Sequence, residues 1–173
     1  MTKSFINNIF LFVILVLTQA IVFNNLILFN TAVAFVFLYF IIVQPISINI
    51  NALLTMSFLL GLSVDIFQDT PGLNALCCTI AAILRRPIFH LFVPRDEDGS
   101  NRLLKIKTLG LGIYLKYVLT FVIVYCVLYF FIEAINYTDM NRLFTRMFGT
   151  IAFTFLVIYA IDSLTLTPRE KRL

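Results

Sequence analysis

The sequence predicts an all-α integral membrane protein, a compact bundle of about six transmembrane helices with both termini in the cytoplasm. Apolar residues make up 61% of the 173 residues and the mean hydropathy is +0.98, whereas soluble domains are roughly half apolar. A spanning helix needs about 20 apolar residues, so a chain of this length holds about six. Strand-like alternation is not sustained, which disfavours a barrel. Residues 1–173 are therefore expected to form a single polytopic membrane domain.

Six apolar runs are the expected spans. The first follows a lone lysine and lacks a small-x-small cleavage site, so we interpret it as a retained helix instead of a signal peptide. Short polar or proline-containing segments separate the other runs: Asn24–Asn30, Gln44-Pro45, Asp69–Gly72 and the charged run Arg95–Arg102. The tail from Thr167 ends the last run. The expected spans are Phe5–Phe23, Thr31–Val43, Ala52–Phe67, Leu73–Leu84 with a possible extension to Val93, Leu109–Glu133 and Thr145–Leu164.

Lysine and arginine residues set the expected orientation. The formal net charge is +4, and the positive residues flank apolar runs, which indicates a topology signal and argues against nucleic-acid binding. With six spans and a cytoplasmic N-terminus, Arg142 and Arg146 are the only lysine or arginine residues expected on the outer side of the membrane. The residues expected on the cytoplasmic side are Lys3, Arg85, Arg86, Arg95, Arg102, Lys105, Lys107, Lys116, Arg169, Lys171 and Arg172.

An ionisable residue lies within the third expected span. Ser57, Gly61 and Asp65 are spaced four residues apart, so they share one helix face, and small residues on such a face let another helix approach closely. Asp65 is expected to point into the bundle, either as a structural or partner-binding residue or as a site for a coupling ion, a proton or a substrate. We favour the structural or partner-binding role.

No catalytic constellation is predicted. Asp65 and Asp162 do not suit an aspartyl protease pair, because Asp65 lies about 20 Å above the cytoplasmic end of its span and Asp162 lies close to the cytoplasmic face. His90 is the only histidine, and the three cysteines, Cys77, Cys78 and Cys126, lack a metal-ligand spacing. The sequence therefore predicts a protein that is not an enzyme and has no cofactor or metal.

The third and fourth runs carry a specific string. Residues Phe58-Leu-Leu-Gly61-Leu-Ser-Val-Asp65-Ile-Phe-Gln-Asp69-Thr-Pro-Gly72-Leu-Asn-Ala75-Leu76 contain a Gly-Leu-x-x-Asp helix end, a short polar turn with glycine, and Asn-Ala-Leu opening the next helix. This passage resembles the signature region of the rod shape-determining protein MreD family. A proline often follows the equivalent of Asn30 in that family, whereas Thr31 stands here. The expected helix-packing or partner-binding residues are Ser57, Gly61, Asp65, Asp69, Pro71, Gly72 and Asn74.

The resemblance implies an inner-membrane scaffold of the machinery that elongates the peptidoglycan wall and sets cell shape. Members of the family are not known as enzymes. They act with the membrane-anchored protein MreC and, through it, with the actin-like MreB, the glycosyltransferase RodA and a penicillin-binding transpeptidase.

One alternative belongs to another class. Small six-helix substrate-binding subunits of energy-coupling-factor transporters have the same size and architecture, and Asp65 would then bind a ligand or ion. Such a subunit needs several polar residues converging on one cavity. The sequence offers Ser57, Asp65, Asn74 and little else, which favours the scaffold.

Overall fold

The computed structural model describes residues 2–23, 32–70, 72–93, 104, 109–136 and 140–164. These residues are mostly helical and form no strand, which confirms the predicted all-α class. The elements are the helices α1 (Thr2–Thr18), α2 (Leu38–Val43), α3 (Ile50–Gln68), α4 (Leu73–His90), α6 (Leu111–Glu133) and α7 (Met140–Leu164), with a π-helical turn η1 (Gln19–Phe23) and a 3₁₀ turn η3 (Ala134–Asn136).

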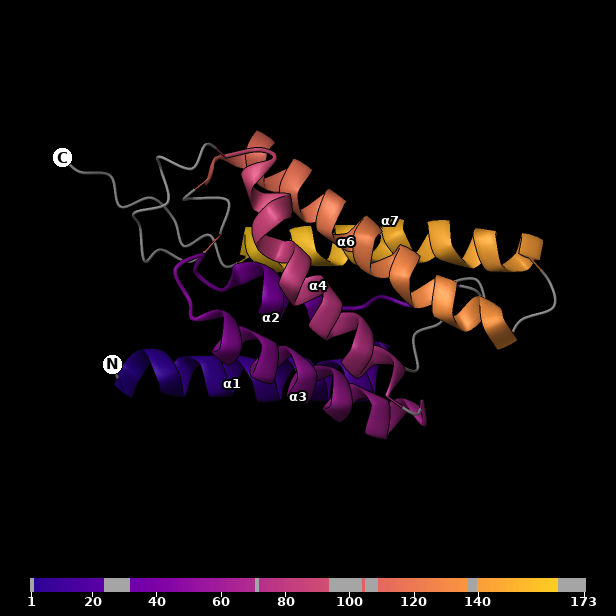
Figure 1. Ribbon diagram of the computed structural model, residues 1–173, viewed down its shortest axis with the longest axis horizontal. Coiled ribbons are helices and arrows are strands. Elements are labelled where there is room, and N and C mark those ends of the chain that lie inside the picture. The colour runs from indigo at the N-terminus through magenta and orange to yellow at the C-terminus, as the bar shows by residue number, and fades with distance from the viewer. Residues whose placement is uncertain are drawn as a thin grey trace.

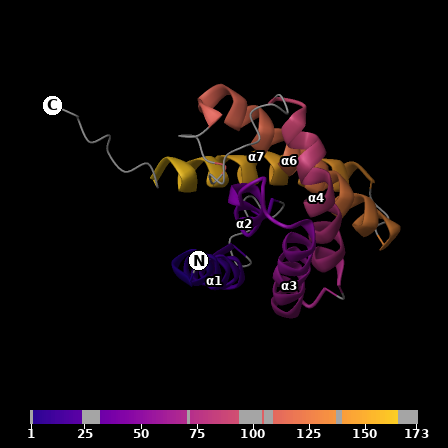
Figure 2. The ribbon, with the colours of Figure 1, turned by 60° about the vertical axis from the view of Figure 1, so that its left-hand side comes forward.

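The chain runs back and forth between two ends of an elongated bundle (Figure 1). Helices α1, α3 and α6 begin at the left end of that view, whereas α4 and α7 begin at the right end and run back. Helix α2 lies in the middle, between α1 on one side and α7 on the other, as Figure 2 shows from a second direction. The expected connections Asn24–Asn30 and Arg95–Arg102, the tail from Thr167 and Pro71 lie outside the described residues.

Three helices, α3, α6 and α7, are long and apolar enough to cross a membrane. Their outward faces carry large exposed side chains such as Ile66, Phe131 and Phe148, which are 73%, 74% and 66% exposed. Water does not tolerate a continuous belt of this kind, whereas the hydrocarbon of a bilayer does. The surface therefore suits a membrane protein.

Several helix ends differ from the expected spans. Helix α3 covers Ala52–Phe67 with small extensions, and α4 continues past Leu84 as far as His90, with Pro87 inside it. Helix α6 begins at Leu111, two residues later than expected, and α7 begins at Met140, five residues earlier than Thr145. The first expected span, Phe5–Phe23, is made of α1 followed by the wider turn of η1.

The second expected span is wrong as a helix. Of the run Thr31–Val43, only Leu38–Val43 is α-helical, and the described residues 32–37 are non-helical. This segment is nevertheless enclosed, since Ala34, Val36 and Phe37 are fully buried. Its valine and phenylalanine residues are weaker helix formers than leucine or alanine, so local preference does not enforce a helix here.

Side chains from other elements replace the missing helical hydrogen bonds. The Gln19 carboxamide donates to the carbonyl oxygen of Ala34 (3.0 Å) and accepts from the N–H of Val36 (2.9 Å). The hydroxyl oxygens of Thr150 and Thr154 accept from the N–H groups of Val33 (3.4 Å) and Phe35 (3.1 Å). A buried peptide group without a partner costs several kcal/mol in hydrocarbon, so these bonds permit a non-helical segment inside the bundle.

One stripe of α7 holds this segment. Thr150, Thr154, Ile158 and Asp162 are spaced four residues apart and are all buried, so they form one face of the helix. At the far end of the stripe, the Tyr39 hydroxyl donates to the Asp162 carboxylate (2.9 Å). The polar residues of α7 thus follow the segment from Val33 to α2.

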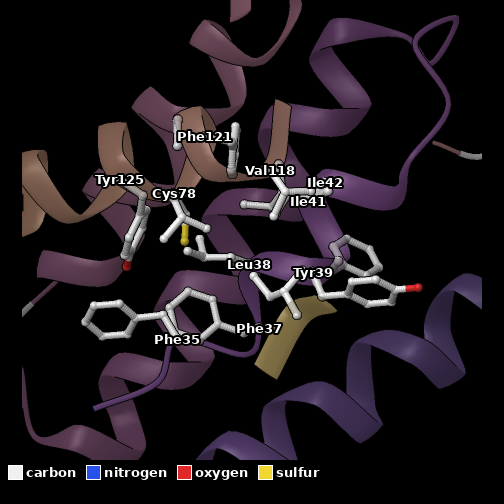
Figure 3. Packing of buried hydrophobic residues seen from close by; sticks show 14 of the residues in the cluster. Phe35, Phe37, Leu38, Tyr39, Ile41, Ile42, Cys78, Val118, Phe121 and Tyr125 are labelled. Carbon is white, nitrogen blue, oxygen red and sulfur yellow. The ribbon is translucent and has the colours of Figure 1, made fainter. Parts of the chain in front are cut away.

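Large side chains pack around the segment on its other sides (Figure 3). The ring of Phe35 lies edge-on to Tyr125 with centroids 5.3 Å apart, and the ring of Phe37 meets Tyr125 at 5.9 Å. Cys78 and Phe121, both fully buried, belong to the same core. The three cysteines are free thiols that pack as small apolar residues, in line with the sequence interpretation.

Thr154→Val tests the support of this segment. The change keeps the size of the side chain but leaves the buried N–H of Phe35 without its acceptor, so we expect the free energy of unfolding to fall by about 1–3 kcal/mol. Thr145→Val is the matched control, because Thr145 is exposed on the same helix and bonds only the carbonyl of Asn141. We expect it to change stability by less than about 0.5 kcal/mol. Equal unfolding transitions in detergent for the two variants would contradict the proposed support.

Candidate functional site

The turn between α3 and α4 contains a saturated carboxylate. Asp65 Oδ1 accepts from the Thr70 hydroxyl (2.5 Å) and from both the backbone N–H and the side-chain amide of Asn74 (2.9 Å each), and Asp65 Oδ2 accepts from the N–H of Ala75 (2.9 Å). A helix leaves its first N–H groups without partners, and a negative charge there is favoured by the helix dipole. Asp65 therefore caps α4 from the preceding helix. We call Asp65, Thr70, Asn74 and Ala75 the Asp65 clamp.

Two left-handed residues make the tight turn possible. Asp69 ends α3 with φ 56°, a conformation that aspartate tolerates better than most residues. Gly72 precedes α4 with φ 77°, where the absence of a Cβ removes the steric cost. The N–H groups of Asp69 and Thr70 both donate to the carbonyl of Asp65, which closes the end of α3. The chain can then return within a few residues, so that Asp65 reaches the start of α4.

Asn74 connects the clamp to a third helix. Its side-chain N–H group also donates to the side-chain oxygen of Gln68 (2.9 Å). The side-chain oxygen of Asn74 accepts from the hydroxyl of Tyr125 in α6 (2.8 Å). Asn74 and Tyr125 are fully buried. The hydrogen-bonded network therefore fixes the positions of α3, α4 and α6 relative to one another.

Helices α3 and α4 come into backbone contact at Gly61. A Cβ added to Gly61 would lie 2.5 Å from the Cα of Ala75 and 2.5 Å from the carbonyl oxygen of Asn74. Both atoms are backbone, so neither can rotate away. Ser57, one turn earlier, is also fully buried. The face of Ser57, Gly61 and Asp65 is therefore the contact face of α3 against α4.

The arrangement is suited to holding helices together. Asp65 is 4% exposed, and both of its oxygens are occupied by groups of its own hairpin. Asp162 belongs to a separate cluster with Tyr39, in the last turns of α7. Within the described residues, no group of three His, Cys, Asp or Glu side chains could hold a metal ion.

The structure brings three of the predicted site residues together, Gly61, Asp65 and Asn74, and buries Ser57 on the same face of α3. Asp69 and Gly72 act through the backbone of the turn, and the side chain of Asp69 is exposed. The sequence interpretation missed Gln19, Thr150 and Thr154, which support residues 32–37. Their signal was present as isolated polar residues inside apolar helices, two of them four residues apart.

A second polar anchor, also missed, lies at the opposite end of α4. Arg85 is fully buried and donates to the carbonyl oxygens of Gln44 and Pro45 (3.4 Å for Pro45) and to the Tyr117 hydroxyl (3.3 Å). Arg86 donates to the carbonyls of Ile46 (3.3 Å) and Ile48 (2.8 Å). Positive groups are favoured near the carbonyl groups at the C-terminal end of a helix. The two arginines of α4 therefore bind the backbone that directly follows the C-terminal end of α2.

Comparisons of this chain with family models, with curated proteins and with solved structures found no match. The family resemblance of the signature string remains a prediction from the residues themselves.

Gly61→Ala tests the close approach of α3 and α4. Because the added methyl group meets backbone atoms, the helices must separate, and we expect a loss of about 1–3 kcal/mol in the free energy of unfolding. Gly112→Ala in α6 is the matched control, since a Cβ there has no neighbour within 4 Å. It should leave stability unchanged or raise it slightly. A Gly61→Ala protein as stable as the control would show that the contact is looser than described.

Asp65→Asn tests the charge in the clamp. The amide keeps the shape but replaces one acceptor oxygen by a donor that faces the N–H groups of α4, so we expect a loss of about 1.5–3 kcal/mol. Asp69→Asn removes an exposed carboxylate at a left-handed residue, where asparagine is equally suited, and should be close to neutral. Thermal unfolding of both purified variants is the measurement, and identical transitions would rule out the capping role.

Proposed function

We propose that this chain is a non-enzymatic inner-membrane scaffold of the cell-wall elongation machinery, similar to MreD, and that it is needed for cell shape. The main support is the structure that residues 58–76, which resemble the MreD signature region, form between α3 and α4. Gly61 supplies the close helix contact, Asp65 and Asn74 supply the clamp, and Gly72 supplies the turn. The residues that carry the resemblance thus build one rigid helical hairpin.

The described polar groups also favour a scaffold. Asp65, Gln19 and Arg85 are directed at backbone groups of the protein itself, where they fix the positions of helices. Such bonds give a small membrane protein a defined shape without an active site. The outward faces of α3, α6 and α7 remain apolar and are available to lipid or to helices of other proteins.

Six crossing segments with both termini in the cytoplasm are part of the proposal. The alternating directions of the elements support it, because the start of α1 and the end of α7 lie at the same end of the bundle (Figure 1). Arg85 and Arg86, at the end of α4, belong to that end, whereas Arg142 and Arg146, at the start of α7, belong to the other. The first of these ends is the cytoplasmic one under the positive-inside rule.

The proposed partners follow from the family resemblance. They are an MreC-like membrane-anchored protein and, through it, MreB, RodA and a penicillin-binding transpeptidase. The rigid hairpin of α3 and α4, whose outer face exposes Phe58, Leu62 and Ile66, is the surface that we expect an apolar partner helix to contact.

The pockets favour the scaffold over the transporter subunit. The pocket beside the Asp65 clamp has a volume of about 170 Å³, below the several hundred Å³ that a small nutrient requires. The larger groove of about 560 Å³ lies between α6 and α7 and is lined by apolar side chains. Neither provides the large polar cavity of a nutrient-binding subunit.

Depletion and rescue in a rod-shaped bacterium test the function. We expect depletion to round and widen the cells and to stop insertion of labelled wall precursor along the flank, because the complex disperses. Rescue by Gly112→Ala should be complete, whereas Gly61→Ala, which disturbs the hairpin, should restore shape only in part. MreC-like and RodA-like proteins should co-purify with the intact chain. Normal shape and wall labelling together with lost uptake of one small nutrient would instead favour the transporter subunit.

A further inference from the structure

A small pocket with both apolar and hydrogen-bonding side chains in its lining lies at the edge of the Asp65 clamp, and we call it the polar pocket after its hydrogen-bonding residues. It has a volume of about 170 Å³, and its polar lining comes from the α3–α4 turn, α6 and α7. The polar lining residues are Gln68, Thr70, Tyr129, Arg146 and Thr150. Elements that are distant in the sequence therefore converge on one site, which shares Thr70 with the clamp.

The lining is rich in hydrogen-bond donors. The side-chain oxygen of Gln68 accepts from Asn74, which leaves the side-chain NH₂ group of Gln68 as the donor toward a ligand. The Thr150 oxygen accepts from the N–H of Val33, so its hydroxyl hydrogen can donate elsewhere. Tyr129 adds a phenol hydroxyl and Arg146 a guanidinium group. A ligand that suits these groups carries several acceptor oxygens.

Charge at the pocket is nearly balanced. Arg146 pairs with Glu133 at 3.0 Å, and Glu133 does not line the pocket. The ion pair holds the guanidinium in place, and Arg146 is the member of the pair that lines the pocket. A singly charged phosphate, whose oxygens accept from arginine and hydroxyl groups, fits this lining better than a cation does.

An apolar groove adjoins the pocket. It has a volume of about 560 Å³ and lies between α6 and α7, where it is lined by residues such as Phe131, Ile135 and Phe144. Phe130 lines both the groove and the polar pocket, and the Arg146 guanidinium lies 5.8 Å from the centre of its ring. A ligand that fills both sites would place oxygen acceptors on one side of Phe130 and hydrocarbon on the other. Such a ligand is an amphiphile.

The depth of the pocket points to the lipid of the bilayer. Arg146 lies six residues after the start of α7 at Met140, about 9 Å along the helix axis. In a helix that crosses a membrane, this position is near the boundary between headgroups and hydrocarbon. Phospholipid phosphates are concentrated at that level.

We propose that the polar pocket binds the phosphate of a membrane phospholipid and that the groove between α6 and α7 holds one of its acyl chains. The bound lipid would tie the α3–α4 hairpin, through Gln68, to α6 and α7. The site requires only that the chain lies in a bilayer, so it is independent of the proposed role in wall synthesis.

The test is native mass spectrometry of the full chain in detergent, titrated with phosphatidylglycerol, with diacylglycerol and with inorganic phosphate. We expect phosphatidylglycerol to bind and diacylglycerol, which lacks the phosphate, to bind at least about tenfold more weakly. Tyr129→Phe and Arg146→Gln should each weaken phosphatidylglycerol binding by about tenfold. Arg142→Gln is the matched control, since Arg142 is exposed on the same helix and outside the pocket, and it should not change the affinity.

Ala134→Trp separates the lipid from a free anion, because Ala134 lines the groove and not the polar pocket, so a larger side chain there takes space that an acyl chain needs. It should abolish binding of phosphatidylglycerol and leave any binding of inorganic phosphate unchanged. Equal affinities for phosphatidylglycerol and diacylglycerol, unchanged binding in both Tyr129→Phe and Arg146→Gln, or displacement of the lipid by equimolar inorganic phosphate would each overturn the proposal. Circular dichroism identifies any variant that fails to fold, and the remaining variants then decide.

Discussion

The non-helical backbone of residues 32–37 imposes the constraint on which the other helices depend. Inside an apolar bundle its peptide groups have no water to bind, so other elements must bring polar side chains to them. Gln19 does this from the end of the first helix, and Thr150 and Thr154 do it from α7. The turn η1, which follows the first helix, and α7 are therefore held against residues 32–37 by hydrogen bonds as well as by packing.

The same principle operates at both ends of α4. Asp65 satisfies the N–H groups at its start, and Arg85, near its end, satisfies the carbonyls that follow α2. A fully buried guanidinium or carboxylate is costly unless hydrogen bonds surround it, and here neighbouring backbone provides them. Asp65 and Arg85 thus act as connectors between segments, which supports the proposed scaffold role.

Hydropathy predicted α3, α6 and α7 well because each is a long apolar run, and composition placed the turn at Asp69–Gly72. The spacing of Ser57, Gly61 and Asp65 also identified the contact face of α3. Residues 32–37 were mistaken for helix because hydropathy measures burial and does not report which groups satisfy the backbone. Two of its partners, Thr150 and Thr154, lie more than a hundred residues away in α7, so local patterns cannot show which backbone groups they bind.

The most direct test of this account is the measurement of ¹³Cα chemical shifts by NMR for the chain in lipid nanodiscs. We expect non-helical shifts for Val33, Ala34 and Phe35 and helical shifts from Leu38 to Val43. Slow amide exchange at Phe35 and Val36 should accompany them, because their N–H groups are buried and bonded to Thr154 and Gln19. Uniform helical shifts from Ala32 to Val43 would contradict the account, since the polar side chains of α7 and Gln19 would then have no backbone to support.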